Sequence, residues 1–145
     1  MEEELKQRTL TIIKPECVAG KHIGDIIGRI EKAGFDILGI KMLKLKKEDA
    51  EQFYLVHKGK PFYEELVNYM SGGKVVVMIL EKENCVTDFR AFIGATNPQD
   101  AAAGTIRKDF GTSIQFNCVH ASDSVENSAI EISFFFSNRE IIECL

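Results

Sequence analysis

The sequence predicts one domain that mixes β-strands with α-helices. Its 145 residues suit a single hydrophobic core, and a chain of this size buries about 68–70% of its unfolded surface without disulfides or metals. Strand-like apolar runs alternate along the chain with runs of helical periodicity. We therefore predict one domain over residues 1–145. Periodicity leaves two architectures open, a parallel α/β sheet or an antiparallel sheet with helices on one face.

Four segments have the composition of strands. Residues 75–80, Val-Val-Val-Met-Ile-Leu, are apolar throughout, which is typical of a central strand buried on both faces. Residues 35–45 contain alternating apolar side chains, as a half-buried strand does. Two shorter strands are expected at 9–13, where Lys14-Pro15 ends the run, and at 117–120.

Helices are expected between these strands. The first has isoleucines at helical spacing and ends at Gly34. Asn84 is a predicted N-cap, and Asp123 with Glu126 resembles a capping box. Residues 94–116 form a long connection with a short helix near 99–103, and connections this long are usually functional. The predicted helices cover residues 23–33, 47–57, 61–70, 84–93 and 123–136, with a final turn at 137–140.

The composition argues against several classes of protein. Lys and Arg number 18 against 22 Asp and Glu, a net charge of −4, so the basic field that supports nucleic-acid binding is missing. The longest apolar run, 75–80, is far too short to span a membrane, and the acidic N-terminus does not resemble a signal peptide. We expect a cytoplasmic protein that needs neither membrane nor nucleic acid. The cysteines form no Cys-x-x-Cys pair, which favours free thiols; they are Cys17, Cys85, Cys118 and Cys144.

Conventional phosphate and metal motifs are absent from the sequence. It contains neither a P-loop nor a Gly-x-Gly-x-x-Gly dinucleotide motif. The three histidines lack the His-Glu-x-x-His spacing, and no second Cys/His pair complements Cys118 and His120 as zinc ligands. A site for phosphates must therefore be built from other residues.

The densest group of reactive side chains is Asn-Cys-Val-His-Ala-Ser-Asp-Ser at 117–124. We expect His120 where a strand ends and a capped helix begins, since helix N-termini attract anions. Its imidazole can be neutral, and so nucleophilic, at physiological pH. Glu131 could fix one ring nitrogen and leave the other free to attack. Taken alone, this segment is explained more simply by a half-buried structural histidine and a solvated Glu131.

A second group surrounds the long connection. Arg90, Thr96 and Arg107 could converge on a polyphosphate, because arginine presents a planar, permanently charged fork to phosphate oxygens. The alternative is a pair of surface arginines in solvated ion pairs. Tyr54 and Phe62 are candidates for positioning and for base stacking, although aromatic residues near helix starts are more often core.

Taken together, these segments resemble the nucleoside diphosphate kinase family. The resemblance spans nearly the whole chain from about Thr9, and the set around His120 with the two loop motifs is highly specific. The matching segments are Thr11-Ile-Ile-Lys14-Pro15, Phe53-Tyr54, Lys60-Pro61-Phe62-Tyr63, Tyr69-Met70-Ser71-Gly72, Gly94-Ala-Thr96-Asn97-Pro98, Gly104-Thr105-Ile106-Arg107-Lys-Asp109-Phe110 and Asn117-Cys-Val-His120-Ala-Ser122-Asp123-Ser124-Val-Glu126.

The resemblance implies an α+β sandwich of ferredoxin-like topology, a four-stranded antiparallel sheet with helices packed on it. It implies an enzyme that maintains triphosphate pools by reversible ping-pong transfer of the γ-phosphate of ATP, or another nucleoside triphosphate, to a nucleoside diphosphate. His120 is the implied nucleophile and carries the phosphate as phosphohistidine. Mg²⁺ is expected to arrive on the nucleotide phosphates with no direct protein ligand. The expected partners are nucleoside di- and triphosphates and further copies of the chain, as a tetramer or hexamer.

The resemblance also assigns roles within the site. Glu131 and Ser122 should support the imidazole, and Tyr54 should help hold it or the transferred group. Phe62 should stack on the base, with Ile114 on the other side, and stacking tolerates any base. The remaining implied nucleotide contacts are Lys14 and Asn117 at the ribose and nearby phosphate oxygens, and Arg90, Thr96 and Arg107 at the phosphates.

The sequence departs from the family pattern at four places. Ala121 follows the histidine where glycine is usual, and Glu16 replaces the usual aspartate. Phe116 stands where a basic residue is common. The sequence ends at Leu145, short of the C-terminal extension of animal-type members, which leaves the size of the oligomer open.

Overall fold

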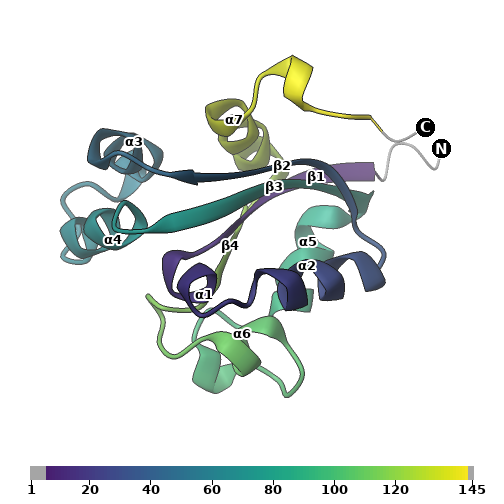
Figure 1. Ribbon diagram of the computed structural model, residues 1–145, viewed down its shortest axis with the longest axis horizontal. Coiled ribbons are helices and arrows are strands. Elements are labelled where there is room, and N and C mark those ends of the chain that lie inside the picture. The colour runs from purple at the N-terminus through teal and green to yellow at the C-terminus, as the bar shows by residue number, and fades with distance from the viewer. Residues whose placement is uncertain (1–5, 144–145) are drawn as a thin grey trace.

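The computed structural model describes residues 6–143 and contains a four-stranded antiparallel sheet (Figure 1). The strand order is β2-β3-β1-β4, and every neighbouring pair is antiparallel. The antiparallel α+β topology implied by the resemblance is therefore confirmed, and the parallel alternative is wrong. The strands are β1 (Lys6–Ile13), β2 (Asp36–Lys44), β3 (Lys74–Glu83) and β4 (Val119–Ala121).

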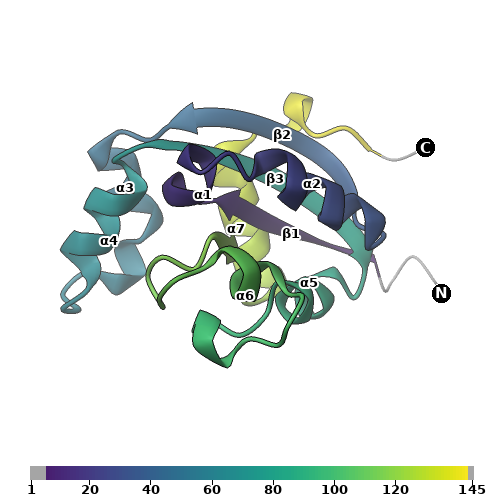
Figure 2. The same ribbon diagram turned by 60° about the horizontal axis from the view of Figure 1, so that its bottom comes forward.

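Helices cover both faces of this sheet. In Figure 1, α7 lies above the strands, α1, α2 and α5 lie below them, and α3 with α4 projects beyond one end. Figure 2 shows the loop that follows α6 reaching toward α4. The helices are α1 (Pro15–Ala19), α2 (Ile23–Lys32), α3 (Lys47–Phe53), α4 (Tyr63–Met70), α5 (Cys85–Ile93), α6 (Ile106–Phe110) and α7 (Val125–Phe135), with 3₁₀ turns η2 (Leu55–His57), η3 (Pro98–Asp100) and η4 (Asn138–Glu140).

Strand β3 explains why both faces must be covered. Its apolar run is buried at every position from 75 to 80. Because side chains alternate along a strand, Val75, Val77 and Ile79 pack with α3, α4 and α7, while the intervening three residues pack with α1, α2 and α5. The central position predicted for this strand is confirmed. The expectation of helices on one face only is wrong, because such a run needs cover on both sides.

Two short helices, α1 and α6, were not predicted from the sequence. Helix α1 begins at Pro15, and α6 is capped by the Thr105 hydroxyl, which accepts a hydrogen bond from the backbone N–H of Lys108 at 3.2 Å. Each contains only 5 residues, too few to show a helical period. The helix expected near 99–103 is instead the 3₁₀ turn Pro98–Asp100.

Two predicted caps differ from the structure. Asn84 precedes α5 but adopts a left-handed conformation, with φ 52°, and makes no side-chain cap. Helix α7 is capped by Ser124, whose hydroxyl accepts from the backbone N–H of Asn127 at 3.0 Å, rather than by Asp123. The predicted final turn is present at Asn138–Glu140, and Ser137 and Glu140 form a capping box at its start.

Some expectations concern the chain as a whole. Between residues 6 and 143, no helix is long and apolar enough to cross a membrane. Cys17, Cys85 and Cys118 are free and buried, as expected. Cys144, the acidic residues 1–5 and the C-terminal Leu145 lie outside the described residues.

Candidate active site

A cleft of about 450 Å³ lies where β4, the α3–α4 segment and the loop after α6 meet. Its lining comes from segments more than 100 residues apart in the sequence, which the β1–β4 pairing brings together. Seven residues predicted from the sequence line it, namely Lys14, Tyr54, Phe62, Thr96, Ile114, Asn117 and His120.

His120 is held from one side of its ring. Its Nε2 lies 2.8 Å from Oε1 of Glu131 on α7. A carboxylate can only accept, so this contact places the ring proton on Nε2 and leaves the lone pair on Nδ1. Within residues 6–143, no side chain or backbone group hydrogen-bonds Nδ1. The arrangement thus presents an imidazole with one fixed nitrogen and one nitrogen available for attack.

Ser122 supports this arrangement through Glu131 rather than by touching the imidazole. Its buried hydroxyl donates to Glu131 Oε1 at 2.7 Å and accepts from the backbone N–H of Leu10 at 3.2 Å. The ring of Phe53 packs edge-on against His120, with centroids 5.6 Å apart. The imidazole is therefore fixed by a carboxylate on one side and by an aromatic ring on another.

His120 lies close to its expected position between a strand end and a capped helix, since β4 ends at Ala121 and α7 is capped by Ser124. His120 occupies the middle of β4, and its ring meets Glu131 well inside α7. An amide in the first turn of that helix is already capped by Ser124. Glu131, rather than the helix terminus, thus provides the direct polar contact to the imidazole.

Lys14 and Asn117 form a buried polar pair in the cleft that His120 also lines. The Lys14 ammonium donates to Asn117 Oδ1 at 2.7 Å, and Asn117 Nδ2 donates to the backbone carbonyl of Thr96 at 3.0 Å. Burial and, to a smaller extent, the charge of Arg107 lower the pKa of Lys14 to about 8. An ammonium in such an environment gains from any anion that enters the cleft.

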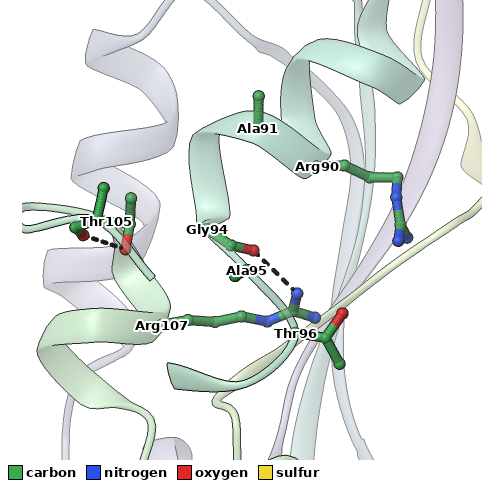
Figure 3. Close-up of a pocket in the computed structure, with 8 residues that line it drawn as sticks. Arg90, Ala91, Gly94, Ala95, Thr96, Thr105 and Arg107 are labelled. Carbon is green, nitrogen blue, oxygen red and sulfur yellow. Dashed lines mark hydrogen bonds between the residues drawn. The ribbon is translucent and has the colours of Figure 1, made fainter. Parts of the chain in front are cut away.

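The two arginines lie in an adjoining hollow of about 420 Å³, which shares Thr96 with the cleft (Figure 3). The side chain of Arg90 is exposed. Arg107 is buried, and donates from Nη1 to the Gly94 carbonyl at 3.2 Å and from Nη2 to the Val119 carbonyl at 2.9 Å. Burial lowers the pKa of Arg107 to about 10, with the charge of Arg90 adding to the effect. Arg107 thus ties the end of α5 to the residue before His120.

The aromatic residues occupy different depths of the cleft. Tyr54 is buried, and burial raises the pKa of its phenol, with the charge of Glu131 adding to the effect. Phe62 is 42% exposed and Ile114 is 61% exposed. An exposed aromatic ring and an exposed aliphatic side chain lining one cleft are suited to an apolar, planar group.

A strained residue sets the backbone just before His120. Cys118 has φ 78°, which is unfavourable for a residue with a Cβ. Its N–H donates to Glu16 Oε2 at 3.1 Å, and its carbonyl accepts from the Lys14 N–H at 2.8 Å. Burial raises the pKa of this Glu16 carboxyl. The glutamate that departs from the family pattern therefore helps to hold the segment that carries the nucleophile.

The other departures are also accommodated by packing. Ala121 is buried on the α5 side of the sheet. Phe116 lies edge-on against Tyr69 of α4, with ring centroids 4.6 Å apart, so it tethers the loop after α6 through an apolar contact.

Four residues of the site were missed by the sequence analysis. His57, Leu66 and Gln115 line the cleft, and Phe53 packs on His120. The Phe53-Tyr54 motif could have indicated the last of these, because its two members are adjacent in sequence. Nothing in the local pattern around 57, 66 or 115 marks those positions.

Comparison with known proteins shows which family the chain resembles in sequence. The family model described as "Nucleoside diphosphate kinase" matches residues 7–141. The chain is 57% identical to the nucleoside diphosphate kinase of Chlamydia felis, over 94% of this chain and 96% of the relative. It is 55% identical to that of Chlorobium chlorochromatii, over 94% and 97% of the respective chains.

Solved structures agree with the sequence relatives. The nucleoside diphosphate kinase of Aquifex aeolicus superposes with a TM-score of 0.93 at 41% identity, over 94% of this chain and 99% of that one. The halophilic enzyme of Halobacterium salinarum, solved in complex with CDP, gives 0.92 at 35% identity, over 97% and 93%. The chain therefore belongs to the nucleoside diphosphate kinase family.

Proposed function

We propose that this chain transfers the γ-phosphate of a nucleoside triphosphate to a nucleoside diphosphate through a phosphate carried on Nδ1 of His120. The observation that supports this most strongly is the ring geometry. Nε2 is fixed by Glu131 at 2.8 Å, and the same ring lines the cleft that contains Lys14, Phe62 and Asn117.

The reaction consists of two half-reactions. In the first, the Nδ1 lone pair attacks the γ-phosphorus, the bond from that phosphorus to the bridging oxygen breaks, and the nucleoside diphosphate leaves with the electron pair. The imidazole becomes positively charged, and Glu131 balances that charge through Nε2. In the second half, a terminal phosphate oxygen of another nucleoside diphosphate attacks the phosphorus, the bond between phosphorus and Nδ1 breaks, and its electron pair returns to the ring, which regenerates neutral His120.

Cationic and polar groups hold the phosphates. Arg90 and Thr96 are open to the adjoining hollow, and Lys14 with Asn117 reaches the ribose and nearby phosphate oxygens. Arg107 contributes its charge from beneath, because two of its nitrogens already donate to backbone carbonyls. Preorganised charge of this kind stabilises the dispersed negative charge of a loose phosphoryl transition state.

Enzymes of this family use a divalent metal ion and act on nucleotides. Within residues 6–143, no group of three or more His, Cys, Asp or Glu side chains is placed to hold a metal ion. We propose that Mg²⁺ enters as part of the substrate, bound to the nucleotide phosphates, since magnesium commonly binds through phosphates and retained waters.

The base is proposed to lie between Phe62 and Ile114. A base stacked on an aromatic ring contributes binding free energy whatever its identity, which suits an enzyme that serves several nucleotides. Tyr54 closes the deep side of the cleft beside the imidazole. A cytoplasmic location and a tetrameric or hexameric homo-oligomer complete the proposal, and light scattering would determine the size of the assembly.

Initial velocities with ATP and GDP varied together test the proposed reaction. A phosphoenzyme intermediate gives parallel double-reciprocal lines, and intersecting lines would contradict it. His120→Asn should abolish transfer while circular dichroism shows an unchanged fold. His22→Asn is a matched control, because His22 stacks on Phe110 at 4.5 Å and does not line the cleft. Full activity in His120→Asn would refute the assignment of the nucleophile.

A further inference from the structure

Gln115 lines the cleft, and the proposed reaction gives it no role. Its amide nitrogen, Nε2, is buried and has no hydrogen-bond partner. Buried N–H groups are nearly always paired in native proteins, because leaving one unpaired is destabilising. An unpaired amide on the wall of a binding cleft points to an acceptor supplied by the bound molecule.

The position of Gln115 assigns this acceptor to the nucleoside end of the substrate. Its neighbour Ile114 and the ring of Phe62 are the side chains proposed to hold the base. His120 and Lys14 lie toward the phosphates. Gln115 also lines a shallow hollow of about 350 Å³ on the outer side of the loop, so it stands between two spaces rather than in the packed core.

The amide can turn to meet such an acceptor. The terminal torsion of a glutamine side chain is broad and roughly two-fold, so exchanging Nε2 and Oε1 costs little. In the orientation that the structure shows, Nε2 is buried and has no hydrogen-bond partner. In the opposite orientation Nε2 takes the place of Oε1, which is not among the buried unpaired atoms of residues 6–143, and there a ligand oxygen in the cleft can accept its hydrogen bond.

We propose that Gln115 is a base-specificity residue that donates from Nε2 to a carbonyl oxygen on the edge of the bound base. This inference rests on the proposed function. Guanine, hypoxanthine, cytosine, uracil and thymine carry a ring carbonyl, whereas adenine carries an amino group and no carbonyl. An amino group would turn Oε1 toward the base and keep Nε2 buried and unpaired. A carbonyl leaves only Oε1 in that buried place, and an unpaired carbonyl oxygen is better tolerated than an unpaired N–H group. Gln115 therefore favours carbonyl-bearing bases over adenine.

Transfer from isolated phosphoenzyme tests this preference one base at a time. Phosphoenzyme prepared with ATP is freed of nucleotide and mixed with GDP, IDP or ADP, and the second-order rate constant is measured for each. In Gln115→Leu, we expect the constants for GDP and IDP to fall by about two- to tenfold, the range for one net hydrogen bond. The constant for ADP should change by less than twofold. IDP has the ring carbonyl of GDP but lacks its 2-amino group, so the comparison of GDP with IDP separates the effect of the carbonyl from that of the amino group.

Two further variants make the result decisive. Gln99→Leu is a matched control, because Gln99 is exposed, lines the outer hollow and does not line the cleft. It should leave all three constants unchanged. Gln115→Glu keeps the length of the side chain but removes its donor, and so should also lower the GDP to ADP ratio. This variant provides the test if the leucine variant does not fold.

The outcomes separate this inference from the proposed function. An equal loss for all three acceptors would assign Gln115 a packing or ribose role and overturn the inference. An unchanged ratio of GDP to ADP in both Gln115 variants would also overturn it while leaving phosphate transfer intact. Failure of the unsubstituted protein to form phosphoenzyme would instead contradict the proposed function.

Discussion

The alkaline side of the pH profile should report the ionisation of Lys14. Burial and, to a smaller extent, the nearby charge of Arg107 lower the pKa of this ammonium to about 8. Only the charged form presents a cation to the nucleotide. As the pH rises through 8, the free enzyme loses that cation, so kcat/KM should fall with pH while it remains level on the neutral side.

The size of this fall follows from the pKa. With a pKa of about 8, about 91% of the free enzyme carries the charge at pH 7 and about 9% at pH 9, a loss of about tenfold in kcat/KM. Bound polyphosphate favours the charged ammonium and raises its pKa. The kcat at saturating nucleotide should therefore fall less than kcat/KM over the same range.

Initial rates between pH 6.5 and 9.5 at constant ionic strength measure both parameters. Lys14→Arg is the matched variant, because a guanidinium stays charged throughout this range. The absolute activity of Lys14→Arg should be lower, but its kcat/KM should no longer fall as the pH rises through 8. A wild-type kcat/KM that stays flat to pH 9.5, or an unchanged limb in Lys14→Arg, would refute the reasoning.

Four further substitutions probe separate parts of the structure. Glu131→Gln keeps an acceptor for the imidazole but removes the balancing charge, so kcat should fall about 100-fold with little change in KM. An unchanged kcat with a raised KM would contradict this. Phe62→Ala should raise KM about tenfold for purine and pyrimidine diphosphates alike, with the melting temperature unchanged, because the ring is 42% exposed. Gly94→Ala should lower the free energy of unfolding in urea by about 1–3 kcal/mol, since Gly94 has φ 100° and an added Cβ would lie 2.6 Å from the Thr105 hydroxyl. Gly28→Ala, in a helix with open space around it, should instead stabilise the protein.

The sequence predicted the elements with a strong local pattern. The apolar run at 75–80 predicted the central strand, and the isoleucine stripe predicted α2, because burial imposes those periods directly. Local pattern could not choose between a parallel and an antiparallel sheet. That choice depends on which strands pair, such as β1 with β3, and pairing between distant segments leaves no local signature. The resemblance to a family supplied it.

For the site too, one part could be predicted from the sequence and another part could not. Its members were identified through the family resemblance, but their contacts depend on tertiary structure. The approach of Lys14 to Asn117 follows from the antiparallel pairing of β1 with β4, and the Arg107 contact with Val119 follows from the placement of α6. The strand that carries His120 was predicted at 117–120 instead of 119–121, because β4 has only 3 residues, too few for periodicity to mark its ends.

The most direct test of the account is to locate the phosphate on the phosphoenzyme. Protein labelled with ¹⁵N-histidine and phosphorylated with ATP can be examined by ³¹P and ¹⁵N NMR at alkaline pH, where phosphohistidine is stable. Because Glu131 occupies Nε2 at 2.8 Å, the phosphorus should couple to Nδ1 of His120. Phosphate on Nε2, on Ser122 or on any other residue would contradict the proposed geometry of transfer.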